Sequence, residues 1–305
     1  MSLTLKILGC SSARPTPDRY STAQALNVLE RFFLIDCGEG AQINMRRFGV
    51  NMLRINHIFI SHAHGDHFYG LPGVISSMSM QGRTSDLHIY GNEKLGPLLE
   101  TITSITDNQL GFNIVFHNLT YKSGLTLLYE DEKLTVHSFP LRHSVPTCGF
   151  LFREKPQLRH LNGVLADELQ IPISKRFGIK QGDDYVAPDG TIYPNSELTK
   201  DPAPPRSYAF MSDTEKLAKA VPWIEGVDLL YHEATYGEDN KKRARENSHS
   251  TARQAAEIAL AAKVGKLIIG HYSNRYDNIK PLIDEARAVF PETYAAKDGA
   301  VFEVK

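Results

Sequence analysis

Three histidines and one aspartate lie within six positions of the chain, in the stretch SHAHGDH. His62 and His64 are two residues apart, so on an extended backbone their side chains point to the same face. Gly65 permits a sharp turn, after which Asp66 and His67 stand where a helix could begin. Zinc and manganese accept imidazole nitrogens and carboxylate oxygens as ligands. This cluster suits two neighbouring metal ions better than one, and we expect a two-metal site here.

Further donors follow apolar, strand-like runs elsewhere in the chain. His143 stands in PLRHSVPT, Asp213 in FMSDT and His271 in LIIGHYS. Because α/β proteins gather functional residues at the ends of strands, we expect these three side chains to complete the coordination. A lone histidine in an apolar run is more often a buried structural residue than a ligand. This second interpretation applies to His57, His88, His137 and His232.

The composition is that of an ordinary soluble globular protein with almost no net charge. The 305 residues are 42% hydrophobic, and 34 Lys and Arg stand against 35 Asp and Glu, a formal net charge of −1. Proteins that bind nucleic acid often have a basic surplus, so such a role requires a local patch here. Three runs could provide one: KKRAR at 241–245, RR at 46–47 and SKRFGIK at 174–180.

The cysteines and the start of the chain predict a cytoplasmic protein. Cys10, Cys37 and Cys148 lie far apart and form no CxxC pair, which indicates neither a disulfide framework nor a zinc ribbon. Free thiols suit a reducing compartment. The opening MSLTLKILGC lacks the pattern of a secretory leader. No run approaches the roughly 20 apolar residues of a membrane span, so we expect no membrane association.

Strand-like and helical patterns alternate and predict an α/β fold. Runs rich in β-branched and aromatic residues indicate strands at 3–9, 31–38, 55–61, 87–91, 133–141, 206–213, 227–236 and 266–273. Apolar periodicity indicates helices at 40–49, 92–105, 249–264 and 279–290. The candidate metal ligands therefore follow strands of the expected sheets.

One segment interrupts this alternation. Residues 154–205 contain many Pro, Gly and charged residues and end in TKDPAPPRS. Loops of this length inside a domain are uncommon and tend to be functional. We interpret the segment as an inserted arm or lid, with an irregular surface loop as the alternative.

SHAHGDH matches the HxHxDH signature, and at this point the chain resembles the metallo-β-lactamase superfamily. The resemblance implies a four-layer αββα sandwich with a dinuclear metal site at one edge of its two sheets. The implied ligands of one ion are His62, His64 and His143. Those of the other are Asp66, His67 and His271, and Asp213 would bridge the pair. Lactamases, glyoxalases, lactonases and nucleases share the signature, so it does not choose the substrate.

Two later motifs resemble those of one family within this superfamily. YHEATY at 231–236 and NSHSTARQAAEIA at 247–259 look like the HEAT and HST motifs of ribonuclease Z, which trims the 3′ trailer from precursor tRNA. The stretches LGCSSARPTPDRYSTAQAL, FLIDCGEGAQINMRR and KDGAVFEV are also similar to that family. Apart from 154–205 the resemblance covers nearly the whole chain, and the length suits the short form. It implies precursor tRNA as substrate, two divalent ions, most simply zinc, and a homodimer.

Hydrolysis of a phosphodiester requires an activated water and a proton for the departing oxygen. Asp66 lies among the metal donors and is our candidate general base. His249 is the candidate acid because histidine titrates near neutral pH. Glu233 could hold the far ring nitrogen of His249 and favour its protonated form. Ser250 and Thr251 are either helix N-caps or part of a helix start that meets a phosphate.

The sequence departs from the family pattern at two places. Family arms, which grip the tRNA elbow, often carry a Gly- and Pro-containing motif that has no clear counterpart between Glu154 and Pro205. The segment LADELQIPISKRFGIKQGDDYVAPDGTIYPNSE keeps a similar layout of helix, basic turn and strand-like end. In addition, MSDT places Ser212 where family members commonly have Gly before the metal-binding Asp.

Two other functions remain open at this stage. One is a hydrolase of small phosphodiesters or lactones with the same metal site. The other is a metal-stabilised RNA-binding module without turnover.

Overall fold

The structure is a computed structural model, and it describes residues 3–105, 110–121 and 124–304. The chain divides into two compact units. The first comprises Met1–Glu130, Thr135–Arg153 and Arg206–Lys305, and the second comprises Asp131–Leu134 and Glu154–Pro205.

The described part of the first unit contains two seven-stranded sheets. The first sheet runs in the order β18, β1, β2, β3, β4, β5, β6. Its strands are β18 (Val301–Val304), β1 (Leu3–Gly9), β2 (Ala23–Val28), β3 (Arg31–Cys37), β4 (Ile55–Phe59), β5 (Leu87–Gly91) and β6 (Ile114–Asn118). Pairing is antiparallel from β18 to β3 and parallel from β3 to β6. The carboxyl ends of β3 and β4 therefore meet at one edge.

The second sheet runs in the order β17, β16, β15, β14, β9, β8, β7. Its strands are β17 (Thr293–Ala295), β16 (Lys266–Gly270), β15 (Leu229–Glu233), β14 (Ser207–Met211), β9 (Cys148–Glu154), β8 (Leu134–Pro140) and β7 (Thr126–Glu130). The four strands from β14 to β17 are parallel, whereas β9 is antiparallel to β14. The loops after β14, β15 and β16 consequently leave the sheet at the same edge.

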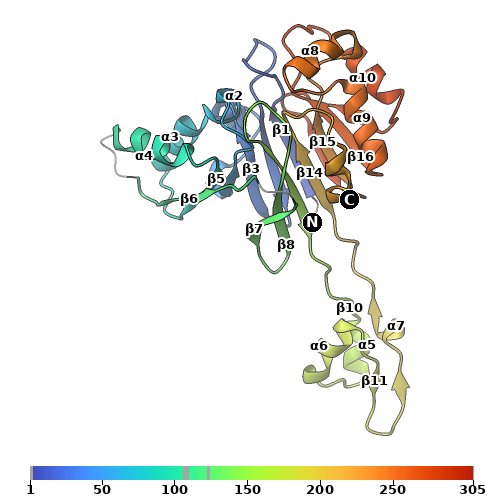
Figure 1. Cartoon of the computed structure of the whole chain (residues 1–305). Helices are drawn as coiled ribbons and strands as arrows, with labels where there is room; N and C mark the ends of the chain where they lie inside the picture. The colour runs from blue at the N-terminus through green and yellow to red at the C-terminus, as the bar shows by residue number, and fades with distance from the viewer. Residues whose placement is uncertain (1–2, 106–109, 122–123, 305) are drawn as a thin grey trace. The chain divides into compact units, whose positions relative to one another are not determined.

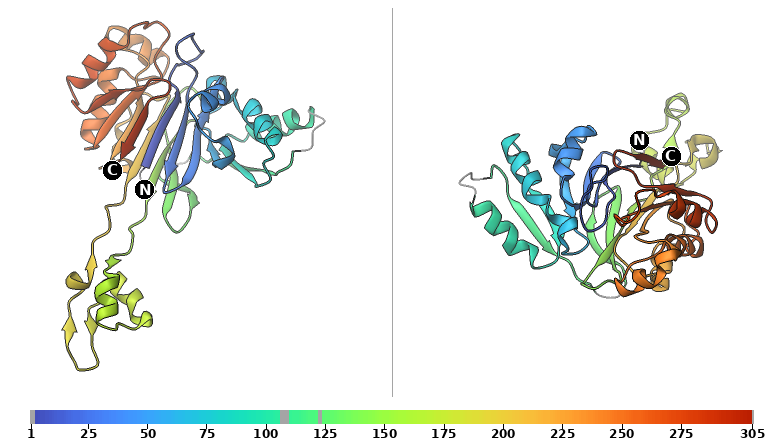
Figure 2. Two further views of the ribbon diagram at one scale, coloured as in Figure 1. Left: turned by 180° about the vertical axis from the view of Figure 1, so that it is seen from behind. Right: turned by 90° about the horizontal axis from the view of Figure 1, so that it is seen from above.

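Helices cover the outer face of each sheet, which gives a helix–sheet–sheet–helix order of layers (Figures 1 and 2). On the first sheet these are α1 (Ala41–Arg47), α2 (Gly65–Phe68), α3 (Leu71–Met80) and α4 (Leu95–Ile105). On the second they are α8 (Lys241–Glu246), α9 (Ala252–Ala261) and α10 (Lys280–Arg287). Short 3-10 turns occur as η1 (Met52–Arg54), η2 (Ala218–Trp223) and η3 (Glu238–Asn240).

Aromatic side chains fill the space between the two sheets. The ring centroids of Phe33 and Phe152 are 5.3 Å apart, and those of Phe59 and Phe150 are 5.4 Å apart. Because side chains alternate along a strand, the neighbours Leu34 and Ile58 face the other way and join the core under the helices. Burial of such side chains contributes about 1.5–3 kcal/mol each, which holds the sheet edges in register.

Each of the expected strand and helix ranges overlaps an element of the same type. The expected ranges do not include several other elements, namely β2, β6, β7, β9 and α3. β2 has the sequence AQALNV, whose alanines are poor strand formers. α3 contains Gly73 in its first turn, and glycine lowers the helix propensity of the segment. Pairing with neighbouring strands and burial, rather than local propensity, form these elements.

The second unit has secondary structure and a small core of its own. It contains β10 (His160–Leu161), α5 (Gly163–Glu168), α6 (Ile173–Gln181), β11 (Tyr185–Val186), β12 (Ile192–Tyr193), α7 (Asn195–Leu198) and β13 (Thr199–Lys200). β10 pairs with β13, and β11 pairs with β12. The core consists of Ala166, Ile171, Ile179, Tyr185 and Leu198. Residues 154–205 are therefore not an irregular loop.

One detail expected of this segment is wrong. The basic run SKRFGIK lies in helix α6 and not in a turn. Ile179 of this run is buried in the small core, which favours the helix and leaves Lys175 and Lys180 exposed.

Within the described residues, no helix is long and apolar enough to cross a bilayer.

Replacement of Asn195 by Ala should loosen the second unit. The buried Asn195 amide donates to the carbonyl oxygens of Ile179 and Asp183 at 2.6 and 2.8 Å, and its own oxygen accepts from Thr199 Oγ1 at 2.8 Å. Loss of these bonds should cost about 1–3 kcal/mol. Hydrogen exchange of the full chain should become about tenfold faster or more within 159–200 and stay unchanged in β14–β16. Ser196→Ala, at an exposed neighbouring position, is the control, and equal exchange in the two variants would contradict the assignment.

Candidate metal centre

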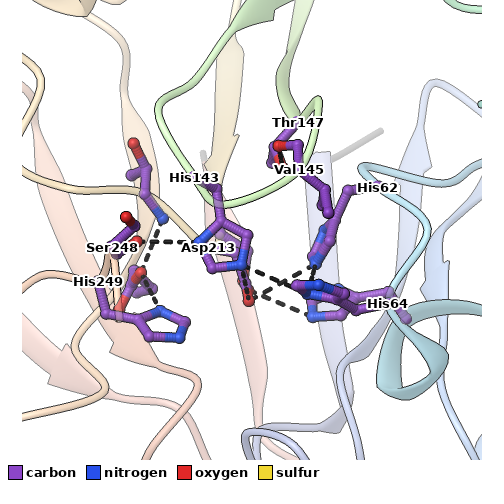
Figure 3. A network of polar contacts seen from close by, with 12 residues as sticks. His62, His64, His143, Val145, Thr147, Asp213, Ser248 and His249 are labelled. Carbon is purple, nitrogen blue, oxygen red and sulfur yellow. Dashed lines mark hydrogen bonds and ion pairs between the residues drawn. The ribbon is translucent and has the colours of Figure 1, made fainter. Parts of the chain in front are cut away.

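The seven predicted metal donors come together where strands of both sheets end. His62 and His64 follow β4, and Asp66 and His67 lie in α2. His143 belongs to the loop between β8 and β9, Asp213 follows β14 and His271 follows β16. Figure 3 shows the first of the resulting groups, with side chains from both sheets turned toward one another.

The first group consists of His62, His64, His143 and Asp213, whose ligand atoms all lie within 4.8 Å of one another. His64 Nδ1 is 3.0 Å from His62 Nε2 and 3.3 Å from His143 Nε2. Asp213 Oδ2 faces the same point, at 3.6 Å from His62 Nε2 and 3.7 Å from His143 Nε2. Three nitrogens and one oxygen thus converge without an intervening side chain.

The second group consists of Asp66, His67 and His271. Asp66 Oδ2 lies 3.5 Å from His67 Nε2 and 3.7 Å from His271 Nε2. Asp213 Oδ1 lies 3.2 and 3.1 Å from the same two nitrogens. Asp213 therefore presents one carboxylate oxygen to each group.

Hydrogen bonds on the far side of the rings show that the donors fit metal ions. His67 Nε2 and His271 Nε2 are buried and have no hydrogen-bond partner among the described residues. Their other nitrogens are held, with His67 Nδ1 2.6 Å from Asp36 Oδ2 and His271 Nδ1 2.9 Å from Thr235 Oγ1. A held Nδ1 and an unpartnered, inward Nε2 are the arrangement that metal-binding histidines adopt.

The first group is held in the same way. His143 Nδ1 donates to the carbonyl oxygen of Ser248 at 2.9 Å (Figure 3). His62 Nδ1 lies 3.0 Å from Ser61 Oγ, which itself donates to Asp36 Oδ2 at 2.9 Å. These contacts fix which nitrogen of His143 and of His62 points inward. The cluster is therefore able to bind metal ions.

Three residues that support the centre have left-handed backbone angles. The φ values are 53° at Asp36, 54° at Asp213 and 58° at His271. Such angles are uncommon for residues other than glycine, and they concentrate at functional sites. Ser212, which occupies a position where glycine was expected from the resemblance, donates from Oγ to Asp213 Oδ1 at 2.9 Å.

The charges around the cluster shift the pKa values of Asp66 and His67 toward their ionised forms. Burial raises the pKa of Asp66, but the charges of His67 and His271 outweigh it, so this pKa lies below its usual range. Burial lowers the pKa of His67, yet the carboxylates of Asp213, Asp66 and Asp36 raise it well above its usual value. Divalent cations at this point would satisfy the same carboxylates.

His249 and Glu233 form a buried pair beside the metal donors. His249 Nδ1 lies 2.7 Å from Glu233 Oε1. Burial lowers the pKa of His249, but the charge and hydrogen bond of Glu233 outweigh it and raise the pKa to about 9. The ring also approaches Asp213 and His271, with ligand atoms within 4.8 Å. The structure therefore places an imidazole that is held by a carboxylate at the edge of the cluster.

Glu233 is bonded on every side. Its Oε1 also accepts from the Thr214 amide at 2.7 Å, and its Oε2 accepts from Thr235 Oγ1 at 2.5 Å and from the Thr235 amide at 3.2 Å. Because Thr235 Oγ1 contacts His271 Nδ1 as well, one carboxylate orients both His249 and a metal donor.

The residues near His249 have separate structural roles. Thr251 is the N-cap of α9 and forms a capping box with Gln254. Ser250 is buried and donates to the carbonyl oxygen of Thr214 at 2.7 Å. His232 is buried with Nδ1 2.7 Å from the Glu233 carbonyl oxygen, and none of the metal groups found among the described residues includes it. His57 and His88 stack on each other with ring centroids 4.9 Å apart, away from these groups.

The centre opens to solvent through a cavity of about 660 Å³. Its lining includes His249, Tyr236, Asn274, Arg275 and five of the seven metal donors, namely His64, Asp66, His143, Asp213 and His271. A polar cavity of this size can admit a phosphodiester group with the sugars on either side of it.

Sequence reasoning missed the residues that orient the donors. Asp36, Ser61 and Thr235 bind the far ring nitrogens or their partners. Asp36 carried a usable signal, because an aspartate inside the apolar strand RFFLIDC must be paired when it is buried. Ser61 and Thr235 carried none, since small hydroxyl residues are common at strand ends.

The chain is similar to several known proteins. It is 45% identical over 294 residues to ribonuclease Z from Bacteroides thetaiotaomicron, a match that covers 96% of this chain and 93% of the relative. It is also 45% identical over 295 residues to ribonuclease Z from Parabacteroides distasonis, with 97% of each chain covered. The family model of the anti-Pycsar protein Apyc1 matches residues 3–158.

Solved structures show the same architecture. The crystal structure of human tRNase Z, short form (ELAC1), matches with a TM-score of 0.72 and 25% identity over 98% of both chains. The metallo-beta-lactamase fold protein YhfI from Bacillus subtilis matches with a TM-score of 0.69 and 18% identity over 100% of both chains. The expected metallo-β-lactamase fold with two sheets between helices is confirmed.

Replacement of Asp36 by Ala should weaken metal binding without removal of a donor. It would leave His67 Nδ1 and Ser61 Oγ without their shared partner. Loss of such a partner typically costs 10–100-fold in metal affinity. Metal titration of the variant, followed by metal analysis, measures this. Asp86→Ala, an exposed position on the same sheet, should bind metal as the unchanged chain does, and equal affinities in both variants would contradict the role of Asp36.

Proposed function

The chain belongs to the ribonuclease Z family, and we propose that it is a metal-dependent endoribonuclease that removes the 3′ trailer from precursor tRNA. The reaction is hydrolysis of one phosphodiester, which leaves a 3′-hydroxyl on the tRNA and a 5′-phosphate on the trailer. The observation that carries the proposal is the buried pair of His249 and Glu233 beside two convergent groups of metal donors. A hydrolase whose leaving oxygen is a poor leaving group needs such a proton donor.

We propose that two divalent ions occupy the centre, zinc in the first place and manganese as the alternative. One would be held by His62, His64 and His143, the other by Asp66, His67 and His271, with Asp213 shared between them. When bound, such ions activate water and stabilise the negative charge that develops on the phosphate. Imidazole and carboxylate suit both metals, so the donor set supports either.

Asp66 is the residue proposed to take the proton of the attacking water. Its Oδ2 is directed to His67 and His271 and also accepts from the Ala13 amide at 2.8 Å. Oδ1 is the remaining oxygen of a carboxylate whose lowered pKa keeps it ionised at neutral pH. The contacts of Oδ2 fix the plane of the carboxylate, so that Oδ1 can face the cavity.

His249 is the residue proposed to donate a proton to the departing oxygen. The phosphorus–O3′ bond breaks as the phosphorus–oxygen bond to water forms, and the proton from His249 completes the new 3′-hydroxyl. Glu233 acts through His249 as a positioning residue, because its bond to Nδ1 directs the other ring nitrogen away from it and toward the cavity.

We further propose that the 154–205 arm, as an insertion in a single metallo-β-lactamase-like domain, contacts the tRNA. Helix α6 presents Lys175 and Lys180, and its apolar side chains Ile173 and Phe177 are 84% and 60% exposed. Exposed cations next to exposed apolar groups suit an RNA surface, where phosphates and base faces lie side by side. We also propose that the protein forms a homodimer. A cytoplasmic location is proposed as well, because the free thiols of Cys10, Cys37 and Cys148 suit a reducing compartment.

A precursor tRNA with a 3′ trailer tests the activity directly. Metal-loaded protein should release the trailer in one cut, a chelator should stop the reaction, and zinc or manganese should restore it. Asp66→Ala should lower the rate by about 10²- to 10⁴-fold while salt-dependent tRNA binding persists. Intact precursor after incubation with the metal-loaded protein would refute the proposal. A hydrolase of small phosphodiesters or lactones would instead turn over such compounds without inhibition by whole tRNA.

The His249→Ala variant separates the proton donor from a metal ligand. It should slow trailer cleavage by about 10²- to 10⁴-fold. Turnover of bis-p-nitrophenyl phosphate should fall far less, since p-nitrophenolate departs without a proton. Metal analysis should show an unchanged ion content. Loss of metal in this variant would instead mean that His249 is a metal ligand. Its ligand atom lies within 4.8 Å of those of Asp213 and His271, which would permit that role.

A further inference from the structure

A second, strongly basic cavity adjoins the metal centre. It has a volume of about 450 Å³ and is formed by the start of α8, the residues after Asp213 and the first turn of α9. Its lining consists of Glu215, Lys216, Lys241, Lys242, Arg245, His249 and Gln254. Four cations therefore stand against one carboxylate. We call it the α8 pocket.

The positive charge of the α8 pocket is only partly neutralised. Lys216 Nζ is 2.6 Å from Glu257, and Lys241 Nζ is 2.9 Å from Glu238. Lys242 Nζ lies 3.9 Å from Glu246, at the limit of an ion pair. Among the described residues, Arg245 has no ion-pair partner, and it is exposed to solvent. A guanidinium with unoccupied donors in a concave, cationic surface is suited to a phosphate.

His249 is the wall that the two cavities share. It lines the cavity of the metal centre and it also lines the α8 pocket. The two cavities therefore adjoin at this side chain, and the direction from the metal centre past His249 leads toward the α8 pocket.

The chemistry of the proposed function decides which part of the RNA takes this path, and the inference rests on that function. Hydrolysis that leaves a 3′-hydroxyl on the tRNA makes O3′ the departing oxygen, and His249 must stand beside the oxygen that it protonates. O3′ belongs to the nucleotide on the 5′ side of the scissile bond. The 5′ side of the strand thus lies on the His249 side of the centre.

We propose that the α8 pocket binds backbone phosphates on the 5′ side of the scissile bond, in the strand that becomes the 3′ end of the mature tRNA. Arg245 is the principal contact, and Lys241 and Lys242 add to the local positive field. The pocket fixes the direction in which the RNA strand crosses the metal centre, since the trailer lies on the other side of the reacting phosphate. Phosphate contacts carry no sequence information, which fits an enzyme that acts on many tRNAs.

Inhibition by the two reaction products tests this polarity. One probe is mature tRNA without a trailer, and the other is a trailer oligonucleotide with a 5′-phosphate. Arg245→Ala should raise the inhibition constant of the mature tRNA by about 5- to 10-fold and leave that of the trailer unchanged. The dependence of log affinity on log salt concentration for mature tRNA should become shallower by about one unit.

Arg243→Ala is the matched control, because Arg243 lies on the same helix and does not line the α8 pocket. This variant should keep the inhibition constants of the unchanged chain. Metal content and the unfolding midpoint of the Arg245 variant establish that its fold and centre are intact. Charge reversal, Arg245→Glu, should enlarge the effect on mature tRNA.

Three outcomes would overturn the inference. Arg245→Ala could raise the inhibition constant of the trailer instead, which would reverse the polarity. It could also leave the inhibition constants of both products unchanged. Finally, Arg245→Ala and Arg243→Ala could raise the inhibition constants of both products equally. That result would indicate a general electrostatic attraction and no specific phosphate site. Failure of the proposed function is a separate result, because the unchanged chain would then leave precursor tRNA uncut.

Discussion

Buried negative charge is the constraint on which the rest of the structure depends. The side chains of Asp36, Asp213 and Glu233 are 0%, 3% and 0% exposed, and an isolated carboxylate in such surroundings would be very costly. Asp36 and Glu233 are satisfied by bonds from Ser61, His67, Thr214, Thr235 and His249. Asp213 is surrounded instead by four histidine rings. Among the described residues, the inward nitrogens of His62 and His143 face no other carboxylate, whereas those of His67 and His271 also face Asp66. Positive charge at the centre, which the proposed metal ions would supply, would stabilise this arrangement of carboxylates.

The two-sheet architecture makes that concentration of donors possible. Parallel pairing of β3 with β4, and of β14 with β15 and β16, brings loops from distant parts of the sequence to one edge of each sheet. A bond from the Cys148 amide to the Ser61 carbonyl oxygen, at 3.2 Å, joins the end of β4 to the start of β9 across the two sheets. The aromatic core between the sheets then fixes their separation, so the donors need no further adjustment to converge.

The sequence indicated which side chains converge at the centre but not the residues that support them, for a physical reason. Histidine and aspartate clustered as HxHxDH have few structural uses, so their types and spacing alone indicated ligands, and a donor after a strand was expected at a sheet edge. The supporting contacts depend on three-dimensional proximity. Thr235 meets His271 and Ser248 meets His143 across 36 and 105 positions of sequence. Strand β2 was missed because its alanines gain stability from burial between neighbours rather than from propensity, and the helical state of the basic run in α6 depends on burial of Ile179.

The shared carboxylate of Glu233 joins the two chemical functions of the site. Through His249 it orients the proposed proton donor, and through Thr235 it orients the metal donor His271. A rotation of Glu233 would therefore disturb both groups at once, and its four hydrogen bonds oppose such a rotation. The Glu233 carboxylate thus fixes the position of the proposed proton donor relative to the metal donor His271. Because His249 lines both the cavity of the metal centre and the α8 pocket, the proposed path of the RNA strand, the proposed proton transfer and the geometry of the centre depend on one buried network.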